Sequence, residues 1–119
     1  MTDCLFCRMV AGEIPADVVH QTDRVLAFRD INPQAPTHVL VIPKEHHATV
    51  GALVEADPVL LSDVVAAAHA VARQEGLVSG EGAEPGYRLV TNTGPHGGQT
   101  VDHLHLHVLG GRGLGWPPG

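Results

Sequence analysis

The chain has 119 residues, of which 44% are hydrophobic and 17% are charged, a balance typical of one globular domain with no room for a second. Its 7 Lys and Arg against 13 Asp and Glu give a formal net charge of −6. This charge disfavours binding to a nucleic-acid polymer, because the phosphate backbone of that polymer is itself densely anionic. A small phosphorylated ligand is still compatible, since backbone N–H groups bind anions locally whatever the net charge.

The N-terminal segment has neither the basic stretch nor the apolar stretch of a secretory signal, and no apolar run approaches membrane-spanning length. We therefore expect a cytoplasmic protein with no membrane partner. In that reducing compartment a structural disulfide between Cys4 and Cys7 is disfavoured. The redox form of Cys-x-x-Cys requires a preceding strand, and only three residues precede Cys4, so metal binding is the favoured functional interpretation. The plain alternative is two half-buried thiols on a short helix.

The first third of the chain predicts a short helix followed by a β-hairpin. Residues 3–10 are expected to form the helix, which Gly12 closes. Residues 18–20 and 24–29 are short β-type segments on either side of the polar turn 21–23.

The middle of the chain predicts a central strand and one long helix. Residues 30–36 form a loop by their prolines, and the apolar, β-branched run 37–42 predicts a central strand that Pro43 ends. Asp57 as N-cap and Pro58 at the first helical position begin the long helix, which Arg73 and Gly76 close. Its apolar stripe, which needs a sheet to cover, consists of Leu60, Leu61, Val64, Val65, Ala68, Val71 and Ala72.

Two further strands are expected at 87–92 and 103–109, before a Gly/Pro-rich C-terminal tail at 110–119. Strands outnumber helices, and most links are short enough for antiparallel pairing. The predicted fold class is therefore α+β: an antiparallel sheet of about five strands, one long helix packed on it and a short N-terminal helix, all within a single domain over 1–119.

Three of the nine histidines, His103, His105 and His107, alternate with leucines near the C-terminus. If this segment is a strand, the three imidazoles point to one face about 7 Å apart, while Leu104 and Leu106 point to the core. Imidazole titrates near neutral pH, attacks electrophiles and binds metals. The pattern therefore predicts one face for packing and one for chemistry.

A glycine-rich loop over 92–100 leads into the histidine segment. Gly97 and Gly98 allow the backbone to turn its N–H groups toward an anion. Taken alone, such a loop is more often a tight connection, but its place beside the imidazoles favours an oxyanion cradle. Its side-chain donors are Asn92, Gln99 and Thr100.

The segment 103–109, His-Leu-His-Leu-His-Val-Leu, resembles the histidine triad motif, and the likeness extends over nearly the whole chain. The chain is identified as similar to the Hint branch of the histidine triad (HIT) superfamily. That resemblance implies a HIT-like fold, a homodimer and a purine nucleoside phosphoramidase. Such an enzyme hydrolyses purine nucleoside 5′-phosphoramidates, at the P–N bond, or aminoacyl-adenylates through a nucleotidyl-histidine and releases the nucleoside monophosphate. Further matching segments are 13–16, 30–38, 41–44, 97–99 and 110–119.

The resemblance also implies roles for individual residues. His105 would attack phosphorus, and His107 would bind the phosphate and protonate the departing amine. Asp30 would bind the ribose hydroxyls, although without the resemblance it is a turn residue, and the two phenylalanines are simple core. The remaining residues implied for nucleotide binding are Phe6, Phe28, Ile31, Asn92, Gly98, Gln99 and Thr100.

The cysteines resemble those of bacterial histidine triad proteins, which bind zinc through Cys-x-x-Cys, a histidine after Val-Ile-Pro-Lys and the first triad histidine. The matching residues here are Cys4, Cys7, His46 and His103, with His47 as the alternative third ligand. A Cys₂His₂ tetrahedron is a closed, structural arrangement, so this zinc would hold the N-terminal helix to the sheet and take no part in catalysis.

Two other functions compete with the phosphoramidase. One is hydrolysis of dinucleoside polyphosphates, as in the Fhit branch, against which the ending at Trp116 speaks; the other is a non-catalytic nucleotide- or zinc-binding interaction protein. The resemblance places the Trp116 tail against the dimer partner. His69 is interpreted as a surface or packing residue, and no role is assigned to His20, His38 and His96.

Overall fold

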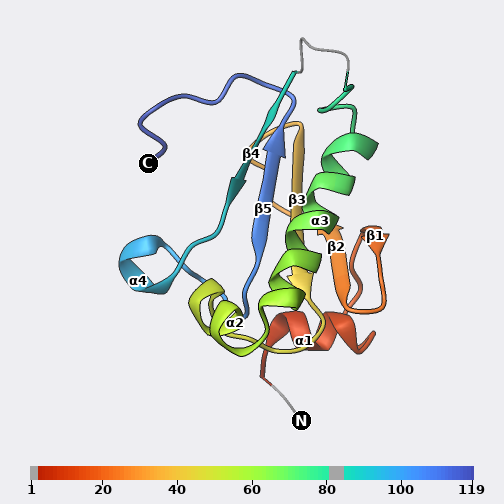
Figure 1. The fold of residues 1–119 in the computed structure, drawn as a ribbon, viewed down its shortest axis with the longest axis vertical. Helices are drawn as coiled ribbons and strands as arrows, with labels where there is room; N and C mark the ends of the chain where they lie inside the picture. The colour runs from red at the N-terminus through yellow and green to blue at the C-terminus, as the bar shows by residue number, and fades with distance from the viewer. Residues whose placement is uncertain (1–2, 81–84) are drawn as a thin grey trace.

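The computed structural model describes residues 3–80 and 85–119, in which one antiparallel sheet has the strand order β1-β2-β3-β5-β4 (Figure 1). Each neighbouring pair is antiparallel, as short connections require. The predicted α+β class and the five strands are confirmed. The strands are β1 (Val18–Gln21), β2 (Val25–Arg29), β3 (Thr37–Pro43), β4 (Tyr87–Val90) and β5 (Leu106–Gly110).

The expected N-terminal and long helices are both present, and the described residues form two further short helices. The long helix starts as predicted, since the Asp57 side chain accepts a hydrogen bond from the Leu60 N–H at 3.0 Å. The same Asp57 ends α2, so one residue serves as the C-cap of one helix and the N-cap of the next. The helices are α1 (Leu5–Val10), α2 (Val50–Ala56), α3 (Pro58–Gln74) and α4 (Gly94–Gly97).

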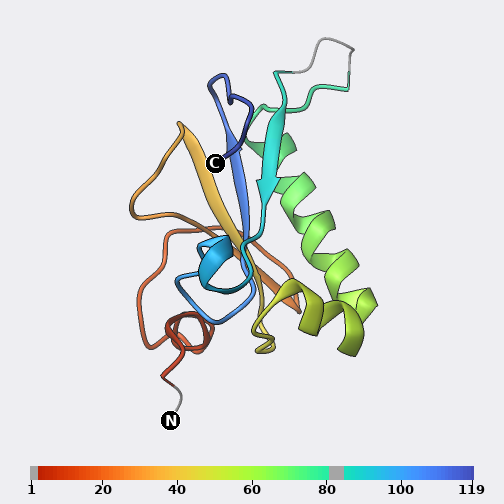
Figure 2. The ribbon, with the colours of Figure 1, turned by 90° about the vertical axis from the view of Figure 1, so that its left-hand side faces the viewer.

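Alternate residues of the central strands pack into two separate cores, one on each face of the sheet. Val39 and Val41 of β3 face the core shared with α3, whereas Leu40 and Ile42 belong to a second cluster with Phe6 of α1. Figure 2 shows α3 along one face of the sheet and α1 on the other side. The second face is therefore the one left for a site between the sheet and α1.

The start of the last strand differs from the sequence prediction. β5 begins at Leu106, so His103 and His105 precede the strand and do not stand in a row on it with His107. The backbone N–H of Leu104 donates to the carbonyl of His47 at 2.7 Å, which takes this segment away from the neighbouring strand. The expectation of three imidazoles at a regular strand spacing was wrong, although Leu104 and Leu106 do face the α3 core.

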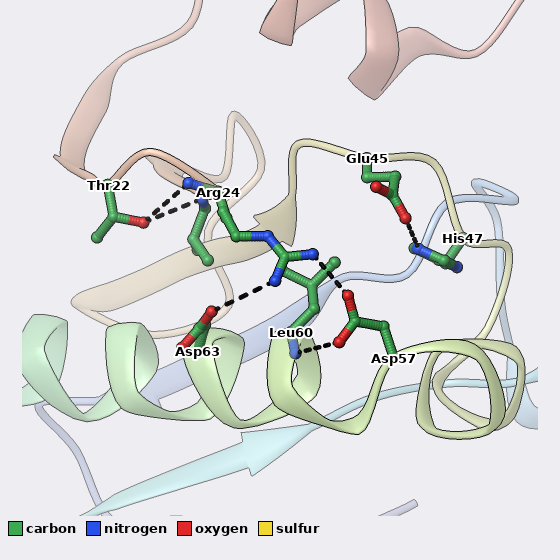
Figure 3. A network of polar contacts seen from close by, with 8 residues as sticks. Thr22, Arg24, Glu45, His47, Asp57, Leu60 and Asp63 are labelled. Carbon is green, nitrogen blue, oxygen red and sulfur yellow. Dashed lines mark hydrogen bonds and ion pairs between the residues drawn. The ribbon is translucent and has the colours of Figure 1, made fainter.

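The junction of α2 and α3 is tied to the β1–β2 turn by a polar network (Figure 3). The guanidinium of Arg24 contacts the carboxylate of Asp57 at 2.6 Å and that of Asp63 at 3.9 Å. Thr22 accepts hydrogen bonds from the backbone N–H groups of Arg24 and Val25 within the turn.

Across the described residues, no helix is both long and apolar enough to cross a membrane.

Candidate active site

A pocket of about 440 Å³ opens on the face of the sheet that carries α1. Its wall is mainly apolar, and its polar groups gather near the histidine segment and near the end of β2, which is the composition expected of a small-molecule site. The apolar wall includes Leu5, Phe6, Met9, Ala16, Phe28, Ile31, Leu40 and Val101, and the polar lining consists of Asp17, Arg29, Asp30, Thr100, His105 and His107.

His105 presents one free ring nitrogen. Its Nδ1 lies 2.8 Å from the carbonyl oxygen of His103, and because a carbonyl can only accept, Nδ1 carries the proton and donates it. In the neutral ring Nε2 then keeps its lone pair. The side chain is 5% exposed and packs against the edge of the Phe6 ring at 5.2 Å between centroids. His105 is thus buried and oriented, and Nε2 is the nitrogen left for chemistry.

His107 lies on β5 directly opposite Leu40 of β3, and its ring is 5.1 Å from that of His105. Burial lowers the pKa of His107 to about 4, and repulsion from His105 and His38 adds to that effect. The ring is therefore neutral at neutral pH. A bound anion would act in the opposite direction and favour its protonation.

His38, to which the sequence analysis assigned no role, completes this arrangement. The backbone N–H of Gln34 donates to His38 Nδ1 at 3.0 Å, so the proton of the neutral ring resides on Nε2. That Nε2 is 2.9 Å from Nδ1 of His107 and 3.4 Å from a carboxylate oxygen of Asp30. His107 Nδ1 therefore accepts, which leaves the proton of His107 on the Nε2 atom.

The strand pattern contained a signal for His38. It lies on β3 in phase with Leu40 and Ile42, the residues that face the α1 side of the sheet. It therefore had to share a face with the site once that face was known. Burial is the main cause that lowers the pKa of His38, and the Asp30 carboxylate partly offsets it.

A second group of side chains, Cys4, Cys7, His46 and His103, has the spacing of a metal site, and its four potential ligand atoms lie within 4.8 Å of one another. His103 Nδ1 is 3.3 Å from Cys4 Sγ, 3.5 Å from Cys7 Sγ and 3.2 Å from His46 Nδ1. Ligand pairs of a tetrahedral zinc site are separated by about 3.3–3.6 Å for N–N and N–S pairs, given the usual bond lengths. The spacing fits zinc.

The hydrogen bonds behind these ligands support the same fit. His103 Nε2 donates to the Pro43 carbonyl at 2.8 Å, which leaves Nδ1 free to face the thiols. Of the two candidate third ligands, His46 lies in the cluster, with Nδ1 3.3 Å from Cys7 Sγ. His47 instead contacts the Glu45 carboxylate at 2.7 Å (Figure 3).

The other residues predicted to bind nucleotide are divided between the pocket and the adjoining loop. Phe6, Phe28, Asp30, Ile31 and Thr100 line the pocket, and Ile31 is 98% exposed at its rim. The others are not among the described residues that line it; they are Asn92, Gly98 and Gln99.

The glycine-rich loop has a fixed conformation in which Gln99 is the central residue. Its side-chain oxygen accepts from the Gly94 N–H at 3.0 Å, and its amide nitrogen donates to the Ala48 carbonyl at 2.7 Å. Gly98 caps α4 with φ of +82°, a conformation that favours glycine. Gln99 therefore holds the loop that presents Thr100 to the pocket.

Comparison with known proteins gives matches over nearly the whole chain. Residues 11–114 match the HIT domain family. The chain is 47% identical to the purine nucleoside phosphoramidase of Escherichia coli, covering 95% of this chain and 91% of that protein. It is 48% identical to a 14 kDa zinc-binding protein of Zea mays, covering 97% and 87%. A crystal structure of a HIT family hydrolase from Legionella pneumophila superposes with a TM-score of 0.90 at 52% identity, covering 98% and 100%.

Proposed function

The chain belongs to the HIT domain family, and on that premise we propose that it is a purine nucleoside phosphoramidase. In this proposal it hydrolyses the P–N bond of nucleoside 5′-phosphoramidates, or the P–O bond to the acyl group of aminoacyl-adenylates, and releases the nucleoside monophosphate. The observation that carries the proposal is the placement of His105: a buried imidazole that lines the pocket and whose Nδ1–H is fixed by a carbonyl, so that Nε2 is the nitrogen left for chemistry.

The first step is attack on phosphorus. The Nε2 lone pair of His105 forms an N–P bond, and the P–N bond to the amine breaks, which gives a nucleotidyl-histidine and the free amine. The proton on Nδ1 stays there and remains hydrogen-bonded to the carbonyl of His103, so the charge that develops on the imidazole is partly stabilised by that acceptor.

The departing amine needs a proton, which His107 supplies in this proposal. Its ring lies 5.1 Å from that of His105, and His38 keeps the proton of the neutral His107 ring on Nε2. The negative charge of the bound phosphate favours the protonated ring, which loses its proton to the amine as the P–N bond breaks. In the second step water attacks phosphorus and gives a proton to His107, the N–P bond breaks, and His105 is regenerated.

The pocket wall would hold the nucleoside. Asp30, fixed by the Asn32 N–H at 2.8 Å, would accept from the ribose hydroxyls. Phe6 and Phe28, whose rings meet edge-on at 5.5 Å, would wall the base, and Thr100 would donate to a phosphate oxygen.

The cluster of Cys4, Cys7, His46 and His103 is proposed to hold structural zinc. A closed set of two thiolates and two imidazoles leaves no position for water, so zinc there would supply cross-linking of α1 to the sheet. We place the protein in the reducing cytoplasm, where both thiols stay available as ligands.

We propose a homodimer as the assembly. β4 lies at one edge of the sheet, and an edge strand in a stable protein is covered or paired. Trp116 is 83% exposed at the end of a tail that Arg88 holds through the Gly115 carbonyl at 2.8 Å. In the dimer this tail would lie near the partner's pocket. Light scattering at micromolar concentration should give twice the chain mass of 12.5 kDa, and a fully active monomer would contradict the dimer.

The decisive experiment compares His105→Ala with the wild-type protein on a nucleoside 5′-phosphoramidate. The variant should still bind AMP and should lose turnover by several orders of magnitude, because it lacks the nucleophile proposed to form the covalent intermediate. His69→Ala is the matched control, since His69 is exposed and contacts Tyr87 away from the pocket. Near-normal turnover by His105→Ala, or a preference for a dinucleoside polyphosphate over the phosphoramidate, would refute the assignment.

A further inference from the structure

The pocket has a second polar region away from the nucleophile. The Phe6 ring contacts both the His105 ring, at 5.2 Å, and the Phe28 ring, at 5.5 Å, and so bridges the two parts of the pocket. Beside Phe28, the backbone N–H of Arg29 donates to the carbonyl of Asp17 at 3.0 Å. Asp17 and Arg29 therefore form the polar lining at the Phe28 end.

The charged groups at this end differ in how firmly the protein holds them. The guanidinium of Arg29 is bound by both oxygens of Glu75, at 2.7 and 3.3 Å. One oxygen of Asp30 accepts from the Asn32 N–H at 2.8 Å. Asp17 is 75% exposed in its side chain, and its ion pair with Arg29 is long, at 3.9 Å. Asp17 is thus the carboxylate of the pocket lining that is best able to bind a ligand.

We propose that Asp17 makes the pocket select guanine over adenine. The inference rests on the proposed function, in which the phosphate lies at His105 and the ribose at Asp30, so that the base extends along Phe28 toward Asp17. An ionised carboxylate offers two acceptors and no donor. Guanine presents two adjacent donors, N1–H and the 2-amino group, which match both carboxylate oxygens.

Adenine fits the same group less well. Its corresponding edge presents one donor, the 6-amino group, beside the N1 acceptor, whose lone pair would face a carboxylate oxygen. A well-formed two-point contact to a base discriminates by about tenfold or more, and an exposed site belongs at the low end of that range. Hypoxanthine, which keeps N1–H and lacks the 2-amino group, should fall between the two.

The test measures base preference in turnover and, separately, in binding. kcat/KM is determined for guanosine and adenosine 5′-phosphoramidates with the same amine, and Kd for GMP and AMP by calorimetry. The wild-type protein should favour guanine about tenfold in both measurements. In Asp17→Asn the carboxamide offers one donor and one acceptor, which matches adenine, so the ratio should fall to one or below.

Asp23→Asn is the matched control, because it removes the same charge from the β1–β2 turn and outside this pocket. It should keep the wild-type ratio. A wild-type GMP to AMP ratio near one, or an unchanged ratio in Asp17→Asn, overturns the inference and leaves the phosphoramidase proposal standing. If the wild-type protein binds GMP in preference to AMP but turns over neither phosphoramidate, base selection by Asp17 holds and the proposed function fails.

Discussion

Acid should destabilise the protein through His107, and the size of the effect follows from its pKa. In the folded state burial lowers the pKa of His107 to about 4, while an unfolded histidine has a pKa near 6.5. The unfolded state therefore binds the proton first as the pH falls. The contribution of the neutral His107 ring to the free energy of unfolding is fully present above pH 6.5 and is lost as the pH falls toward 4. The complete loss is at most about 3.4 kcal/mol, of which about 2 kcal/mol is reached at pH 5.

The assay is urea unfolding at pH 7.5 and pH 5 for the wild-type protein and His107→Asn, whose amide does not titrate. The free energy of unfolding should fall by about 2 kcal/mol more in the wild-type protein than in the variant. Both proteins keep the cysteine–histidine cluster, so a contribution from metal loss cancels in the comparison. Equal pH dependence in the two proteins, within about 0.5 kcal/mol, would refute the buried neutral state of His107.

Three further predictions concern metal, backbone and capping. Protein purified without chelator should carry close to one zinc per chain. The Cys4→Ser variant should lose the metal, and its free energy of unfolding should fall by at least about 2 kcal/mol. Wild-type protein that is metal-free and fully stable would contradict the zinc site. The Gly111→Ala variant should lower the free energy of unfolding by about 1–3 kcal/mol, because Gly111 has φ of +90° and a Cβ there would lie 2.8 Å from Pro36 Cβ. Gly113→Ala, with open space around it, should stay within about 0.5 kcal/mol of wild type in the same denaturation experiment. The Asp57→Ala variant should lower the free energy of unfolding by about 1–2 kcal/mol, because it loses the α3 cap and the Arg24 contact. An unfolding curve equal to that of Asp63→Ala would exclude this capping role of Asp57.

The parts of the fold that were predicted from the sequence are those encoded by local chemistry. Asp57 and Pro58 mark the start of α3 because capping and a fixed φ act within one turn. The apolar, β-branched run before Pro43 predicts β3, and it is unbroken because every residue of that strand is buried. The short helix α2 was missed: with seven residues it gives little periodicity, and its cap at Thr49 precedes a glycine at position 51.

The candidate site was predicted in its residues more than in its geometry. The triad pattern led to His105 and His107, which both line the pocket, but a two-residue period cannot show that the strand begins only at Leu106. The role of His38 depends on its contact with His107, which is 69 residues away and comes together only through the pairing of β3 with β5. No local signal contains that pairing, so the residue that sets the protonation of His107 was left without a role.

The three triad histidines are equivalent in the sequence, and groups outside the motif make them different. His103 Nε2 donates a hydrogen bond to the Pro43 carbonyl, which leaves Nδ1 to the thiols. His105 Nδ1 donates to the carbonyl of His103, which leaves Nε2 for chemistry, while His38 donates to Nδ1 of His107, so that the proton of the neutral His107 ring is on Nε2. In the proposed function, the neighbours would thus make a ligand, a nucleophile and a proton donor from one repeated side chain. Because two of the three assignments rest on main-chain carbonyls, a shift of the segment before β5 would alter the nucleophile without any change in the triad itself.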